Sequence, residues 1–273
     1  MTEVWRFPIR WTMCENLPLQ QNLYMLPGHI GLAEYETTLG IAQELSGSLV
    51  TLQNLPGSLH KLFQLTADKY NIDYILVDMS RSLGPINQNI ICTRDYFLVP
   101  MTPDYFSVMA IESLASVLPK WKKWANTAQE TKVLKEAIYP LPDSSPKFLG
   151  TIIQKYRLRS GTTASAAFQR WIDEIQNKLA AVLIPALRDN GMMMPDEVYA
   201  DAGIPLPEPI IQMSEFNGLI AQSQKYSVPV FALTDEQLEL KGIVLGCTKK
   251  SMELFRQLFS LCADRIISIT THG

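Results

Sequence analysis

The sequence predicts an α/β fold in which a mostly parallel sheet is flanked by helices. Short apolar segments of strand length alternate along the chain with longer segments that repeat apolar residues at helical spacing. A strand, a helix and a further strand in that order are typical of parallel pairing with right-handed crossovers. The short segments are also apolar on both faces, as strands are when helices cover a sheet from both sides.

Each element follows from its own pattern. The segments that suit buried strands by length and content are 22–27, 73–79, 95–101, 148–156, 208–213 and 228–233. Helical patterns occupy 32–45, 58–70, 83–93, 106–124, 164–183 and 251–269. The proline-containing stretches 139–147 and 192–209 are expected to be surface connections, too short to separate two cores. We therefore expect one domain over residues 1–273, with a divergent N-terminal segment at 1–21.

Composition narrows the class of protein. Hydrophobic residues make up 47% and charged residues 19% of the chain, which indicates a globular protein. The net charge of −3 gives no global sign of a nucleic-acid or membrane partner. The cysteines form no CxxC pair, and the sequence has neither a long apolar run nor a secretion signal. We expect a reduced, cytoplasmic protein with no membrane partner.

The stretch YNIDYILVDMSRSLG, residues 70–84, carries the main candidate site. Its apolar strand, 74–77, is followed directly by Asp78 and then by a Ser/Gly turn. At the carboxyl end of a parallel strand, a side chain points into the crevice where open α/β sheets bind ligands. A carboxylate there needs a cation, a hydrogen-bonding turn or water. Nucleotide hydrolases use this Walker B arrangement to hold Mg²⁺, whereas in other α/β proteins such an Asp is a turn or cap residue.

The stretch YNIDYILVDMSRSLGPINQNIICTRDYFLVPMTPDYFSVMAIESL resembles the central block of the ParA/Soj/MinD type of partition ATPases. NLYMLPGHIGLAEYE resembles the strand-plus-PG element of that family, and FLGTIIQKYRLRSG its strand leading to an adenine-side loop. PIIQMSEFNGLIAQSQKYSVPVFALT resembles the segment before its closing helix. The resemblance covers about residues 22–270, in the family's order.

The resemblance implies a P-loop NTPase-like fold that binds ATP and Mg²⁺ and dimerises when nucleotide is bound. It assigns Asp78 to Mg²⁺ and catalysis, and places the turn residues Arg81, Ser82 and Gly84 and the strand-end residue Gln154 beside the nucleotide. Arg81 stands in a pair, Ser-Arg, where the family commonly has two prolines. It is therefore either a solvated turn residue or a cation facing an anion. Gln154 has an equal alternative as a polar strand end that satisfies a loop.

One family feature is absent from the sequence. The family binds phosphates through a deviant Walker A loop, Lys-Gly-Gly-x-Gly-Lys-Thr, and neither RSGTTAS (159–165) nor GCTKKS (246–251) has its spacing or context. Only 21 residues precede NLYMLPG, whereas a strand, loop, helix and return strand need on the order of 30. We therefore expect the first strand and the P-loop to be missing from this chain, by truncation or by natural loss. An exposed apolar edge should then favour oligomerisation.

Two basic clusters suggest phosphate contacts. PKWKKW places Lys120, Lys122 and Lys123 among tryptophans, and KYRLR contributes Lys155, Arg157 and Arg159. Family members bind DNA non-specifically through surface Lys and Arg, so these residues are candidate DNA contacts. The alternative is a solvated helix end that its tryptophans anchor to the domain.

Three functions are consistent with these patterns. The first is a ParA-like ATPase for partition or cargo positioning, acting as a homodimer or oligomer with a ParB-like partner and non-specific DNA. The second is a non-hydrolysing pseudo-ATPase scaffold that acts through protein contacts. The third, and weakest, is a relative of the ATP-dependent cobyrinic acid diamide synthases, which need a Cys-His pair that the sequence does not show.

Overall fold

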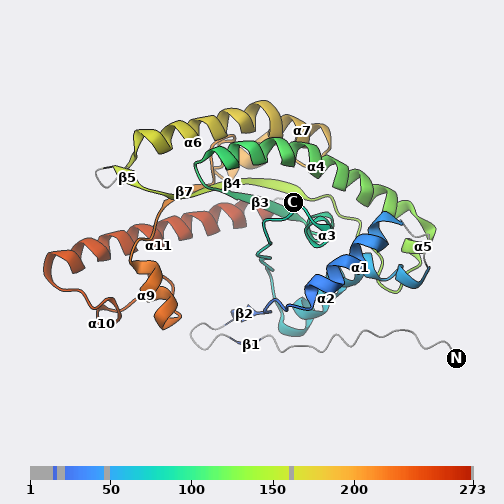
Figure 1. The fold of residues 1–273 in the computed structure, drawn as a ribbon, viewed down its shortest axis with the longest axis horizontal. Coiled ribbons are helices and arrows are strands. Elements are labelled where there is room, and N and C mark those ends of the chain that lie inside the picture. Colours follow the sequence, from blue (N-terminus) through green and yellow to red (C-terminus); the bar gives the residue numbers. More distant parts are fainter. Residues whose placement is uncertain (1–14, 17–21, 46–49, 160–162, 272–273) are drawn as a thin grey trace. The chain divides into compact units, whose positions relative to one another are not determined.

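The computed structural model describes residues 15–16, 22–45, 50–159 and 163–271 (Figure 1). The chain divides into two compact units. Unit 1 contains residues 1–93 and 127–143, and unit 2 contains residues 94–126 and 144–273. Each unit is described below by itself, and the expectation of one domain over 1–273 stays a prediction.

Unit 2 is built on a three-stranded parallel sheet with the order β3-β4-β7. The strands are β3 (Tyr96–Met101), β4 (Lys147–Tyr156) and β7 (Ile211–Ser214). The central strand β4 buries Phe148 and Ile153 completely, because it has a neighbour on each edge and helices over its faces. This confirms the prediction of an α/β fold with a parallel sheet flanked by helices.

Helices connect and cover these strands (Figure 1). Helix α4 (Tyr105–Glu130) follows β3, and its part up to residue 126 belongs to unit 2. Between β4 and β7 lie β5 (Leu158–Arg159), β6 (Thr163–Ala164), α6 (Ala166–Lys178), the π-helical turn η2 (Leu179–Leu183), α7 (Ile184–Asp189) and α8 (Asp196–Asp201). After β7 come α9 (Leu219–Tyr226), α10 (Asp235–Leu238) and the long α11 (Gly242–Thr271), which packs on β7 and α8.

The π-helical turn has a packing role. Ile175, Leu179, Leu183 and Leu187 follow one another at four-residue intervals, and all four are fully buried. In a regular α-helix this spacing drifts around the axis, because one turn takes 3.6 residues. The wider π-helical turn reduces the drift, so that one continuous apolar face covers the sheet.

Unit 1 is mainly helical among its described residues. It contains α1 (Leu32–Glu44), η1 (Val50–Leu52), α2 (Leu55–Tyr70), α3 (Pro85–Cys92) and α5 (Lys132–Lys135), and a short antiparallel pair of β1 (Glu15–Asn16) with β2 (Tyr24–Met25). Leu39, Ala42 and Leu55 form its core. A Cβ on Gly57 would collide with the backbone carbonyl of Tyr139, so glycine is required where α2 meets that segment.

Three predicted strands are wrong. Segment 73–79 has no strand partner among the described residues, and Leu76 is 85% exposed. Segment 228–233 forms turns, and 22–27 contributes only the two-residue β2, which pairs antiparallel. Apolar content predicts that a segment can be a strand. A strand forms only where a neighbour accepts and donates its backbone hydrogen bonds, and the local sequence does not reveal that neighbour.

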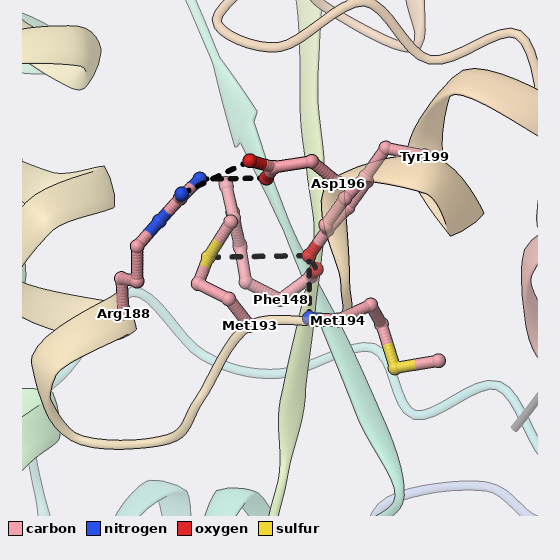
Figure 2. Close-up of polar contacts among 6 residues, drawn as sticks. All are labelled: Phe148, Arg188, Met193, Met194, Asp196 and Tyr199. Carbon is pink, nitrogen blue, oxygen red and sulfur yellow. Dashed lines mark hydrogen bonds and ion pairs between the residues drawn. The ribbon is translucent and has the colours of Figure 1, made fainter.

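The connection expected at the surface over 192–209 is partly buried. The Tyr199 hydroxyl donates a hydrogen bond to the backbone carbonyl of Phe148 in β4 and accepts one from the Met194 amide at 3.2 Å (Figure 2). Met192 is fully buried, and its carbonyl accepts a hydrogen bond from the Phe148 amide at 2.9 Å. Figure 2 also shows the exposed ion pair in which Arg188 donates two hydrogen bonds to Asp196. The connection is therefore attached to the first residues of β4.

Burial raises the pKa of Tyr199 to about 12. We expect Tyr199→Phe to lower the free energy of unfolding by about 1–3 kcal/mol near neutral pH, because buried groups lose their hydrogen-bond partner. The folded pKa lies above the ordinary value of 10.0. Ionisation therefore favours the unfolded chain as pH rises from about 10 towards 12, and the difference between the two proteins should shrink there.

Urea unfolding followed by circular dichroism measures this difference, with Arg188→Ala as the control. That variant removes an exposed ion pair of the same connection and should have a much smaller effect. Equal losses for the two variants would contradict the role given to Tyr199.

Candidate functional site

The candidate site of unit 1 is the turn that follows Asp78 and leads into α3. The side-chain amide of Asn87 donates hydrogen bonds to the carbonyl oxygens of Ser80 at 2.7 Å and Ser82 at 2.6 Å. The hydroxyl groups of these two serines lie 3.0 Å apart. Asn87 is buried in the first turn of α3, so one side chain holds the turn to the helix that follows it.

Helix α3 begins with residues that commonly start helices. Gly84 is the N-cap and Pro85 the first helical residue, where a missing N–H costs nothing. The Ser82 hydroxyl lies 3.4 Å from the Gly84 amide. A Cβ at Gly84 would collide with the Glu36 carboxylate of α1. A glycine at this position therefore lets that carboxylate approach the positive end of α3.

Asp78 lies just before this turn and is exposed, as are Arg81 and Ser82. Asp78, Arg81, Ser82 and Gly84 lie in one short segment of unit 1, and their joint role at a nucleotide stays a prediction. The structure differs from the prediction in the support of Asp78, because residues 74–77 form no strand. The carboxylate therefore follows a segment that belongs to no sheet.

Gln154 belongs to unit 2 and lies near the carboxyl end of β4, where it is half-buried and opposite Met213 of β7. The ladder is irregular there, and Lys155 has a φ of 61°. Such a conformation is uncommon for a residue other than glycine. Beyond it, Arg157 forms an ion pair with Glu215 at 3.2 Å, so this arginine is partly neutralised.

The start of helix α4 follows the carboxyl end of β3. The Asp104 carboxylate accepts a hydrogen bond from the Ser107 amide at 2.8 Å, and the Ser107 hydroxyl accepts one from the Thr102 amide at 3.2 Å. The first bond satisfies an amide in the first turn of α4, and the second ties that turn to Thr102, which precedes the helix. Asp104 is therefore occupied as a cap residue.

The basic candidates are placed differently from one another. Lys120 and Lys123 are exposed on α4, whereas Lys122 lies 3.4 Å from the Ser144 carbonyl and Trp121 is buried. Lys155 is exposed, and the side chain of Arg159 lies outside the described part of the structure. Trp121 thus anchors α4 while two lysines face solvent.

The side chains that could ligate a metal ion together with Asp78 determine which ion it can bind. Among the described residues, no group of three or more His, Cys, Asp or Glu side chains could enclose a metal ion. A single carboxylate suits Mg²⁺ only where phosphate oxygens and water complete the shell, as they do in nucleotide sites. Asp78 therefore fits one position of a Mg²⁺–nucleotide complex and does not by itself make a metal site.

Sequence reasoning missed Asn87 and Glu36. The signal for Asn87 is a polar side chain within the apolar helix PINQNIIC, placed a few residues after a Ser-x-Ser turn. Buried asparagine needs partners for its amide, and the carbonyls of such a turn are the nearest ones. Glu36 gives no comparable signal, because its contact with α3 arises from packing between helices distant in sequence.

Comparisons with known proteins show two similarities. A family model described as an AAA domain matches residues 8–131, which include Asp78 and the turn. The match supports a P-loop NTPase-like ATPase family, and the parallel α/β fold is consistent with it. The uncharacterized protein MJECL24 of Methanocaldococcus jannaschii is 27% identical over 120 residues. That alignment covers 43% of this chain and 40% of the length of the relative.

No solved structure matches the chain. None of the helices that the structure describes has both the length and the apolar character needed to cross a membrane.

The turn should depend on the Asn87 amide. In Asn87→Asp, an acceptor oxygen replaces the N–H donor and faces two carbonyl oxygens, so we expect a loss of about 2–3 kcal/mol of unfolding free energy. Amide hydrogen exchange in residues 80–88 should also become faster. The control is Gln88→Glu, the same change at the next, half-buried position. A loss in the control as large as that at Asn87 would contradict the assignment.

Proposed function

We propose that this chain provides the Mg²⁺-carboxylate side of the nucleotide site in a ParA-type ATPase for partition or cargo positioning. The observation that carries the proposal is the turn after Asp78, which Asn87 ties to α3. The AAA-domain match includes all of these residues. The coarser assignment, a P-loop NTPase-like protein, rests on that match and on the parallel fold.

Each turn residue has a distinct role in this proposal. Asp78 supplies one oxygen to the ion, and the remaining ligands are phosphate and water. Arg81, exposed three residues later, adds positive charge beside a polyphosphate. Ser82 and Gly84 keep the turn open at the N-terminus of α3. The sequence shows no Walker A loop, so in this proposal the turn and Arg81 bind the nucleotide without one.

A second candidate, the non-hydrolysing scaffold, is favoured by one observation. Tyr74 is 48% and Ile75 is 38% exposed, and Leu76 is exposed to a still greater extent. Adjacent exposed apolar residues outside any strand or helix form a surface that another polypeptide can bind. A scaffold would use this segment for protein contacts, and Asp78 would then need no ligand.

The first test is a titration of the chain with Mg²⁺-ATP by calorimetry. The ATPase proposal expects binding that Asp78→Ala weakens by about tenfold or more, since a charge-assisted ligand is lost. Asp73→Ala is the matched control, because Asp73 is an exposed carboxylate at the other end of the same segment. Binding that Asp78→Ala leaves unchanged would contradict the role of Asp78. Absence of binding would favour the scaffold.

DNA binding is a separate part of the proposal. Lys120→Glu combined with Lys123→Glu should weaken non-specific duplex binding several-fold and reduce its salt dependence, because two phosphate contacts are lost. Fluorescence anisotropy with a labelled duplex at several salt concentrations measures both effects. Lys132→Glu, at an exposed lysine of α5, should have little effect. Equal losses in the two proteins would indicate a general charge effect and contradict a site on α4.

A further inference from the structure

Helix α11 has an exposed face that continues over most of its 30 residues. Met252, Phe255, Cys262 and Ile269 are buried on its inner side. On the outer side, one stripe repeats at alternating steps of four and three residues: Ile243, Cys247, Lys250, Leu254, Gln257, Leu261 and Asp264. This spacing is the seam of a two-stranded coiled coil, in which each helix covers the stripe of the other.

The apolar members of this stripe are uncovered. Ile243 is 87%, Leu254 is 45% and Leu261 is 41% exposed, and Cys247 is an exposed free cysteine. Single exposed leucines are common on soluble proteins. Four apolar side chains at seam spacing along one helix instead indicate a surface that packs against another helix.

The polar members of the stripe select the partner. Lys250 precedes Gln257 by seven residues, and Asp264 follows it by seven. Among the described residues, neither Lys250 nor Asp264 takes part in a salt bridge. A second copy turned by 180° about an axis at Gln257 brings its Asp264 opposite Lys250, and its Lys250 opposite Asp264. A parallel second copy would instead place Lys250 against Lys250.

We propose that α11 is a homodimer interface, in which two copies pair antiparallel about Gln257. The same rotation brings Leu254 of one copy beside Leu261 of the other. Such an interface is isologous, because each copy contributes the same stripe. The pairing uses no residue of the turn after Asp78, so it forms without nucleotide and stands independently of the proposed ATPase function.

Sedimentation velocity of the full chain without nucleotide tests the interface. The wild-type chain should form dimers, and Leu254→Glu combined with Leu261→Glu should convert them to monomers. The control is Ala263→Glu, because Ala263 is exposed on α11 about 160° around the helix from the centre of the stripe. A wild-type monomer at all concentrations, or a dimer that the double variant leaves intact, would overturn the proposal.

A charge exchange keeps the test informative if the leucine variants fail to fold. Lys250→Glu should weaken the dimer by about tenfold, because two exposed pairs change from attraction to repulsion. Adding Asp264→Lys restores opposite charges across the interface and should restore the dimer affinity. A double variant that is as weak as the single one would overturn the antiparallel pairing.

Disulfide cross-linking distinguishes an antiparallel from a parallel arrangement of the two α11 helices. Gln257→Cys places two thiols at the axis, so mild oxidation should give covalent dimers. In an antiparallel pair, the two Cys247 residues are separated by 20 helical positions, or about 30 Å along the helix. They should therefore not cross-link. Covalent wild-type dimers through Cys247 would indicate a parallel pair and overturn the proposal.

Discussion

The fold depends on the pairing of strand backbones. A parallel strand buried on both faces needs a neighbour on each edge, because every buried amide and carbonyl requires a partner. Strand β4 has both neighbours, β3 and β7, and it carries the fully buried Phe148 and Ile153. Segment 73–79 has the same apolar character but pairs with no strand among the described residues. The presence or absence of a pairing strand therefore determines that β4 forms part of a sheet and that Asp78 follows a segment outside the sheet.

The candidate site is organised by side-chain contacts in place of a strand. Asn87 donates to two carbonyls of the turn, so the turn after Asp78 keeps its form although the preceding segment forms no strand. A carboxylate on such a support can reach an ion that approaches from solvent. It lacks the fixed direction that the end of a central strand would give it. Under the proposed function, Asp78 would supply one ligand of a nucleotide-bound Mg²⁺, and phosphate and water would supply the others.

Much of the fold could be predicted from the sequence, for a physical reason. Helical periodicity is a local property, so α1, α2, α3, α4 and α11 coincide with predicted helices. Strands β3, β4 and β7 were also predicted from their composition. They form in the structure because each has a neighbour in the chain to pair with. Segments 73–79 and 228–233 have equally suitable compositions, but pairing is a non-local property that composition does not encode. Similarly, Asp78 could be identified as a candidate from its position in a motif. The contact between Glu36 and α3 could not be predicted, because it arises from packing between helices.

Hydrogen–deuterium exchange of the unliganded chain tests the central claim most directly, because it measures backbone pairing in both segments at once. Amides of residues 75–79 should exchange rapidly, because this segment belongs to no strand, while those of β4 should be protected by its two neighbours. Protection of 75–79 equal to that of β4 would contradict the account. It would show that Asp78 already ends a paired strand.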